Sequence, residues 1–358
     1  MKRYHDPLFS AEKRRHPALV FFTLFLILVL VVLLVFNHLN NSRVNLIQQK
    51  VTISSLPSSL ENFRILHISD LHGLYFGAHQ DRLKDTIANA KYDIVCITGD
   101  VTGKNGSYDA FLSLLDLFSD TPVYFIPGDE DPDPITAKPQ LVNSPKADYI
   151  RKAEEKGAVY LDAPVRLEIG KSTLWICPEW VYSLDLDVSL SALNRRHEEL
   201  LKEPYSHEQN AALLAVEYQL DQMDRIREAR RQTLEKDIHI ALTHHPLQLS
   251  AMENLQEWTS SDNDSYVRTV SLVLAGHYVG GQWQLPGIGP LRAPISSGLG
   301  NNGWLPEDEK VSGLSSILGI PQYISPGLGT SSAISLPGIR LFNTPSVTVL
   351  TLTSKLIF

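Results

Sequence analysis

The chain has 358 residues and a formal net charge of −8, a length that allows one large domain or two small ones with a substantial core. Residues 1–36 carry five Lys or Arg and two Asp or Glu, which is +3, so the remainder carries −11. An acidic body of this kind argues against nucleic acid as a partner. The two cysteines, Cys96 and Cys177, lie in apolar strand-like runs, which indicates core residues rather than a disulfide or a zinc pair.

The N-terminal region predicts a membrane anchor. Residues 1–17 form a basic tail, and Ala18–Phe36 is an apolar run in which only Thr23 is polar. A helix needs about 20 such residues to cross a bilayer core. Because basic residues precede this run and only Arg43 follows it closely, the N-terminus is expected in the cytoplasm and the body outside it, in a single-pass protein of the cell membrane. A cleaved signal peptide is the alternative, although no small-x-small cleavage site follows the run.

Residues 37–50 are predicted to be a polar tether, and residues 51–358 to be the folded domain, which an edge strand begins. Buried strands then alternate with helices, a pattern that implies parallel strands joined by helical crossovers. The predicted strands are 63–69, 94–98 and 123–126, and the predicted helices are 80–90, 108–118 and 147–156.

The second half of the chain begins with a less regular pattern. Residues 159–161, 165–169 and 174–177 indicate the short strands of a meander, which could form a second sheet. A charged helical insertion at about 186–236 is expected to cover the domain. Buried strands return at 238–242 and 270–275. Residues 284–335, rich in Gly, Pro and Ser, predict long surface loops, and VTVLTLTS predicts a last strand.

Polar residues directly follow five of the predicted buried strands. They are Asp70 and His72, Asp100, Asp129 and Glu130, His244 and His245, and His277. Each cluster taken alone has an ordinary structural explanation, such as a turn cap or a solvated histidine. Ligands in an open α/β sheet, however, collect outside the carboxyl ends of the strands. Five such clusters in this order therefore indicate a site for divalent metal ions.

The same motifs carry a resemblance to a known family. The chain resembles the calcineurin-like metallophosphoesterases, which have D-x-H, G-D, G-N-H-[DE], a lone His and G-H-x-H, each after a strand. It is most similar to their membrane-anchored bacterial branch, through SDLHG, GHYVGGQ, SPGLGTSS and RLFNTPS. The resemblance covers about residues 51–353. It implies an α/β four-layer sandwich, in which two mixed β-sheets are flanked by helices, preceded by one transmembrane helix.

The resemblance also implies one or two divalent ions, with manganese, iron and zinc all compatible with mixed carboxylate and imidazole ligands. The implied ligands are Asp70 and His72 for the first ion, Asp100 as the bridge, and Asp129, His244 and His277 for the second. His244 is preferred to His245 because the family's lone His lies two residues before a proline, here Pro246. Two such ions polarise the phosphoryl oxygens and supply a hydroxide for in-line attack.

Three positions depart from the family pattern. Asp129 stands for an Asn and still offers an oxygen ligand, while Val279 stands for a His and offers none. Glu130 stands for the His that assists the leaving group, and it is the candidate catalytic proton donor. The predicted function is hydrolysis of a phosphate ester, such as one linked to a lipid or the cell envelope. The alternative is a degenerate relative that binds a metal or a phosphorylated ligand as a receptor or scaffold.

Overall fold

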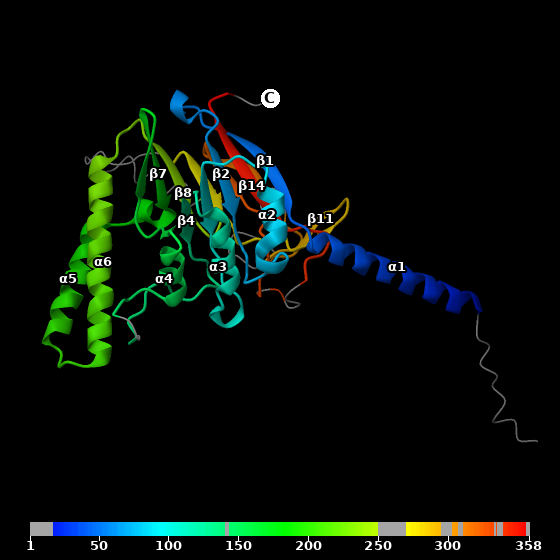
Figure 1. Ribbon diagram of the computed structural model, residues 1–358, viewed down its shortest axis with the longest axis horizontal. Coiled ribbons are helices and arrows are strands. Elements are labelled where there is room, and N and C mark those ends of the chain that lie inside the picture. The colour runs from blue at the N-terminus through cyan, green and yellow to red at the C-terminus, as the bar shows by residue number, and fades with distance from the viewer. Residues whose placement is uncertain are drawn as a thin grey trace, which may run out of the picture.

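The computed structural model describes residues 17–139, 143–249, 270–294, 303–306, 311–332, 334 and 339–355. The predicted basic tail therefore lies, apart from Pro17, outside the described residues. Within them the chain builds two six-stranded sheets that face each other (Figure 1). This architecture, with helices on the outer faces, confirms the predicted fold class.

The first sheet has the order β1-β14-β2-β3-β4-β5. Its strands are β1 (Asn45–Thr52), β2 (Arg64–Ile68), β3 (Ile94–Thr98), β4 (Val123–Ile126), β5 (Ala158–Tyr160) and β14 (Ser346–Thr353). β2 to β5 are parallel, and β14 runs antiparallel to β2 but parallel to β1. The sheet is therefore mixed, as predicted, with short helical crossovers between its parallel strands.

The second sheet has the order β12-β13-β9-β8-β7-β6. Its strands are β6 (Val165–Ile169), β7 (Ser172–Pro178), β8 (Ile238–Leu242), β9 (Leu272–Ala275), β12 (Gly313–Ile317) and β13 (Ile320–Ile324). The four central strands are parallel, and the two outer pairs are antiparallel. A separate hairpin is formed by β10 (Trp283–Leu285) and β11 (Gly289–Arg292).

Apolar side chains fill three layers of packing. Between the sheets, Ile65 of β2 lies in one buried cluster with Ile240 of β8. On the outer face of the first sheet, α2 (Asp81–Ile87), α3 (Asp109–Leu115) and α4 (Asp148–Glu155) cover a second cluster. On the outer face of the second sheet, Ala229 of α6 packs with Trp175 and Cys177 of β7. Both cysteines are buried and free, as the sequence predicts.

The predicted helical insertion is an antiparallel pair, α5 (Leu186–Lys202) and α6 (His207–Gln232) (Figure 1). Its helices begin at side-chain caps, because Asp185 accepts a hydrogen bond from Val188 N and Ser206 accepts one from Gln209 N. The pair is fastened to the loop after β5, where Arg225 donates two hydrogen bonds of 2.8 Å to the buried Asp162 carboxylate. The insertion is thus part of the packed domain.

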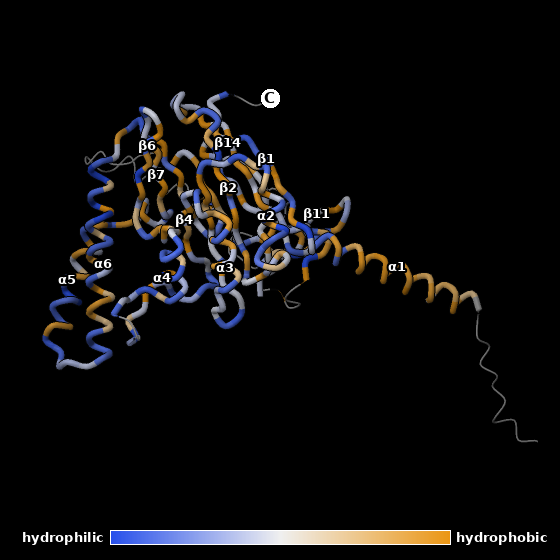
Figure 2. The backbone as a smooth tube through the Cα atoms, viewed as in Figure 1, coloured by the Kyte–Doolittle hydropathy of each residue, from blue (hydrophilic) through white to orange (hydrophobic). Residues whose placement is uncertain are grey.

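Helix α1 (Pro17–Asn41) carries the predicted membrane span. It is apolar along its length (Figure 2), and residues Ala18–Asn41 are long and apolar enough to cross a membrane, a test that a signal sequence near the N-terminus also meets. The helix extends five residues beyond the predicted end at Phe36. There the Asn37 and Asn41 side chains donate hydrogen bonds to the Arg340 carbonyl, at 2.8 and 2.6 Å. The end of α1 is therefore attached to the domain.

The structure corrects three predicted segments. The tether is shorter than residues 37–50, because β1 already begins at Asn45; its alternating, half-exposed side chains look like linker residues in the sequence. Residues 158–160 join the first sheet beside β4 rather than a meander in the second. The region predicted as surface loops contains β12 and β13, and β13 pairs with β9 in the second sheet. Its strands are short and contain Ser, Gly and Pro, so they lack a clear apolar run.

Candidate metal centre

The loops after β2, β3, β4, β8 and β9 bring the predicted polar residues together at the carboxyl ends of these strands. Backbone hydrogen bonds hold the first two loops against each other. Asp70 N donates to Gly99 O at 3.0 Å, and His72 N donates to Asp100 O at 2.8 Å. The loop after β9 joins them, since His277 N donates to the Asp70 carboxylate at 2.9 Å. Three loops far apart in the sequence thus form one rigid cluster.

Four of these residues hold a left-handed backbone conformation that side chains other than glycine rarely adopt. The φ angles are 54° at Asp70, 48° at His72, 53° at Asp100 and 75° at His277. Such conformations cost free energy and persist only where surrounding contacts impose them, typically at functional sites. Here they turn the side chains away from the strand direction and into the cluster.

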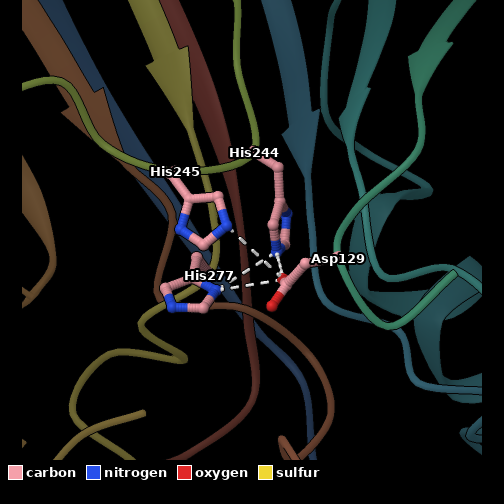
Figure 3. Close-up of side chains that lie close together, drawn as sticks. All are labelled: Asp129, His244, His245 and His277. Carbon is pink, nitrogen blue, oxygen red and sulfur yellow. Dashed lines mark hydrogen bonds and ion pairs between the residues drawn. The ribbon is translucent and has the colours of Figure 1, made fainter. Parts of the chain in front are cut away.

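One half of the centre surrounds the Asp129 carboxylate (Figure 3). Its Oδ1 atom lies 2.8 Å from His244 Nε2, 3.3 Å from His277 Nδ1 and 3.7 Å from His245 Nε2. His244 Nδ1 lies 2.9 Å from the Thr98 carbonyl, to which it can donate a hydrogen bond. That contact leaves Nε2 of His244 free to face the carboxylates, the arrangement that outer partners give to metal-binding histidines.

Asp100 joins the two halves of the centre. Its Oδ2 atom lies 3.2 Å from His244 Nε2 and 3.7 Å from His72 Nε2. Its Oδ1 atom accepts a hydrogen bond from Glu130 N at 2.9 Å, which fixes the orientation of the carboxylate. One oxygen is therefore anchored, and the other lies between two imidazoles. This is the placement that a bridging ligand requires.

The other half contains His72, Asp100 and Glu130, whose ligand atoms lie within 4.8 Å of one another. Glu130 Oε2 lies 3.5 Å from His72 Nδ1. Its Oε1 accepts hydrogen bonds from Ser331 Oγ at 2.6 Å and Ser332 N at 2.9 Å. The carboxylate is thus held beside Nδ1 of His72, while Asp100 lies nearer to Nε2 of the same ring.

Burial and neighbouring charged groups shift the pKa values of the residues in this cluster. Burial raises the pKa of the Asp70 carboxyl, and the negative charge of Asp100 adds to that effect. For His244, burial alone would lower the pKa, but its contacts with Asp100 and Asp129 outweigh burial and raise it well above the ordinary value. Burial alone would raise the pKa of Glu130, yet its contacts with His72 and Ser331 lower it to about 2. Four carboxylates so close together favour bound cations.

The residues present fit divalent ions. The donors are carboxylate oxygens and imidazole nitrogens, which suit several first-row transition metals. His72 Nε2, which faces Asp100 at 3.7 Å, is buried and has no hydrogen-bond partner among the described residues. Such atoms are costly to bury unpaired and are expected to have a ligand. Asp70, Asp100 and His244 form a further group of potential ligands that connects the two halves.

A comparison with protein-family models finds a match to the calcineurin-like phosphoesterase domain over residues 63–280. The chain belongs to the calcineurin-like phosphoesterase family. No curated protein matches it. Among solved structures it is similar to a phosphopantetheinyl hydrolase from Mycobacterium tuberculosis, at 14% sequence identity and a TM-score of 0.35, covering 74% of this chain and 89% of that one.

All seven residues predicted from the calcineurin-like phosphoesterase motifs lie in this one cluster. His245 joins them beside Asp129, although its side chain is half exposed, whereas His244 is buried. Burial lowers the pKa of His245 to about 4, and the neighbouring His277 adds to this effect. Val279 is fully buried and offers no ligand; its carbonyl accepts a hydrogen bond from Asn343 Nδ2 at 2.7 Å.

Supporting residues around the calcineurin-like phosphoesterase motifs were not predicted as site residues. Asp131 accepts hydrogen bonds from Gly128 N at 2.8 Å and Thr102 N at 2.8 Å, so it ties the loops after β3 and β4 together. Arg340 is buried, and its guanidinium donates to Gly329 O at 2.7 Å and Pro326 O at 3.0 Å. The sequence shows the run GDEDPD and the RLFN motif, but it does not show which of their residues face inward.

A cavity of about 740 Å³ adjoins this calcineurin-like phosphoesterase centre. It is lined by His72 and Glu130 on the ligand side and by Leu74, Lys104 and Ser332 on other sides. An exposed lysine and a partly exposed leucine thus lie at the cavity next to the cluster.

Proposed function

We propose that the protein is a metal-dependent phosphoesterase, held in a membrane by α1, that hydrolyses a phosphate ester outside the cytoplasm. The observation that carries the proposal is the position of Asp100, whose Oδ2 atom lies between His72 Nε2 and His244 Nε2, at 3.7 and 3.2 Å. Asp100 belongs to two groups of potential ligands, one with Asp70 and His244 and one with His72 and Glu130. The donors thus form two adjacent groups with one carboxylate in common, as a dinuclear site requires.

The chain's own residues have separable roles in this reaction. Divalent ions, when bound, would polarise the phosphoryl oxygens and activate water. Asp100, Asp129, His244 and His277 would hold one ion, and Asp70, His72 and Asp100 the other. Thr98 O fixes the ring of His244, and the cavity between His72 and Ser332 would hold the substrate. Lys104 at the cavity wall would attract an anionic substrate.

Glu130 is better explained as a positioning residue than as the predicted proton donor. Both of its oxygens face donors, from Ser331, Ser332 and His72. A carboxylate beside Nδ1 keeps the proton on that nitrogen and leaves Nε2 available as a ligand. The consequence is a site without an acid for the leaving group at this position. Esters with good leaving groups are therefore expected to react faster than alkyl phosphates.

Glu130→Gln tests this role. The amide oxygen can still accept from Ser331 and Ser332, so the NH₂ group would face His72 Nδ1 and move the ring proton to Nε2. We expect metal affinity and turnover to fall by about 10- to 100-fold, the usual cost of losing an outer partner of a ligand. Titration calorimetry with Mn²⁺ or Zn²⁺ measures the affinity separately from turnover.

Glu61→Gln is the matched control, because Glu61 likewise accepts hydrogen bonds from Thr353 Oγ1 and Ser354 N, outside the centre. It is expected to leave metal affinity unchanged. Wild-type metal affinity in Glu130→Gln would contradict the positioning role.

The proposed activity is tested on the full-length protein in detergent. The protein is stripped with a chelator, reloaded separately with Mn²⁺, Fe²⁺ or Zn²⁺, and assayed for bound metal and for turnover of an aryl phosphate and an aryl phosphodiester. Metal-dependent turnover of either ester is expected. A fully loaded protein that turns over no ester would favour the second candidate, a non-catalytic binding protein, which the absence of a ligand at Val279 supports.

The extracytoplasmic location rests on the basic residues before α1 and the single Arg43 after it. Protease added outside intact cells, after removal of any outer barrier, is expected to digest the domain while leaving α1 in the membrane fraction. A released product that begins near Val44 would show a cleaved signal instead.

A further inference from the structure

The metal centre and the end of α1 lie at the same end of the first sheet. β1 starts at Asn45, opposite Ser346 of the parallel strand β14, and β14 runs antiparallel to β2. The carboxyl end of β2, which Asp70 follows, therefore lies at the end where β1 starts. Only a few residues separate that start from the end of α1 at Asn41 (Figure 1). The centre thus faces the end of the domain from which α1 leaves.

A short path of hydrogen bonds connects α1 to the centre. Asn37 and Asn41 bind the Arg340 carbonyl. The Arg340 guanidinium binds Gly329 O, and Gly329 N donates to Asp70 O at 2.5 Å. The residues that follow Arg340 make two further hydrogen bonds. Phe342 N donates to Asn37 Oδ1 of α1, and Leu341 O accepts from Gln284 N of the β10–β11 hairpin. The orientation of the centre relative to α1 is therefore fixed.

Exposed apolar side chains gather beside this junction. The apolar patch consists of Ile288, Trp304, Leu305 and Ile339, which are 72, 46, 63 and 42% exposed. Its members are linked through the hairpin: the Trp283 ring contacts the Trp304 ring, its Nε1 donates to Ile339 O, and Leu305 N donates to Leu291 O. Clustered exposed Trp, Ile and Leu side chains mark an interaction surface.

We propose that the apolar patch lies on the surface of the bilayer that α1 spans, so that the metal centre takes a phosphoester carried by a membrane amphiphile. This proposal rests on the proposed function, including the anchor. A bilayer is the occupant because the patch adjoins the end of the only described helix able to cross a membrane, and Trp and aliphatic side chains favour the membrane interface. Leu74 and Tyr75, exposed beside the cavity that His72 lines, would contact the apolar part of the substrate.

Contact of the apolar patch with the bilayer is tested by site-directed spin labelling of the full chain in vesicles of phosphatidylcholine and phosphatidylglycerol. Labels are placed at Ile288→Cys and Leu305→Cys; the native cysteines are buried. Leu318→Cys is the control, an exposed leucine in the turn before β13, at the end of the second sheet opposite the metal centre. Phe25→Cys reports insertion of α1. We expect the first two labels to be shielded from a water-soluble relaxation agent and accessible to oxygen, unlike the Leu318 label.

Equal water exposure of the labels at Ile288, Leu305 and Leu318 would contradict contact of the apolar patch with the bilayer. A water-exposed label at Phe25 would contradict the membrane anchor as well.

A second measurement compares turnover of a vesicle-borne phosphoester with that of a soluble aryl phosphate. In Ile288→Ser/Leu305→Ser the ratio of the two rates is expected to fall about 100-fold, since each apolar side chain withdrawn from a bilayer costs about tenfold in membrane binding. Leu318→Ser should leave the ratio unchanged, and an unchanged ratio in the double variant would overturn the proposal. No turnover of either ester in the wild type, with shielded labels, would refute the proposed function alone.

Discussion

Asp100→Asn is expected to abolish phosphoester hydrolysis and to remove most of the bound metal. The amide oxygen can keep the hydrogen bond from Glu130 N, so the NH₂ group would face the imidazoles of His72 and His244 in place of Oδ2. An NH₂ group cannot bind a cation, and Asp100 Oδ2 is the atom that contacts a histidine of each half of the centre, His244 and His72. The loss should exceed the about 100-fold that removal of an outer partner costs. Elemental analysis and turnover of the purified full-length variant measure both effects.

Asp237→Asn provides the control. Asp237 is also buried and accepts hydrogen bonds, from Trp175 Nε1 and Leu234 N, but it lies on the α6–β8 connection away from the centre. It should lower stability without lowering the metal content of the folded protein. If Asp100→Asn kept wild-type metal content and turnover, the bridging role of Asp100 would be wrong.

Gly128→Ala is expected to have an effect of similar size without removing any ligand. A Cβ atom on Gly128 would lie 2.1 Å from Asp100 Oδ1 and 2.4 Å from Asp100 N, and both distances are far below contact. The loop after β4 cannot move away freely, because Asp131 holds Gly128 N. We therefore expect Asp100 to be displaced, with turnover lost and metal content reduced, as measured by the same assays.

Gly157→Ala is the comparison for Gly128→Ala. Gly157 has a φ of +86°, so alanine there is strained, but its Cβ atom would meet nothing within 4 Å. A lower melting temperature with wild-type turnover is expected for Gly157→Ala. Full activity in Gly128→Ala would mean that the loop adapts and that the close packing against Asp100 is not required.

The sequence predicts the strands that carry the centre because each is a short apolar run that ends in polar residues. β2, β3, β4 and β8 were located from this pattern, and β9 begins two residues later than predicted. β13 is not predicted because IPQYI contains a proline and a glutamine, although four of its five residues are buried. Its position in the sheet depends on pairing with a strand about 50 residues earlier, which no local pattern contains.

For the centre itself, the motifs name the ligands but not their orientation. Nothing in G-D-E-D shows that Glu130 faces Ser331 and Ser332, about 200 residues later in the chain. The preference for His244 over His245 follows from its distance to Pro246, while the proximity of His245 to Asp129 depends on how two loops pack. Side-chain direction in these loops follows from backbone angles that the sequence does not reveal.

The residues of the centre that have left-handed backbone conformations imply that metal ions also affect folding. Asp70, His72, Asp100 and His277 each hold a conformation that costs about 1 to 3 kcal/mol, and the carboxylates of Asp70 and Asp100 are buried in the same cluster. The metal-free domain therefore bears an unfavourable conformational and electrostatic energy at one end of its sheets. An ion that binds only the folded chain offsets this energy by mass action. The supply of metal would then set how much of the protein is folded, as well as how much of it is active.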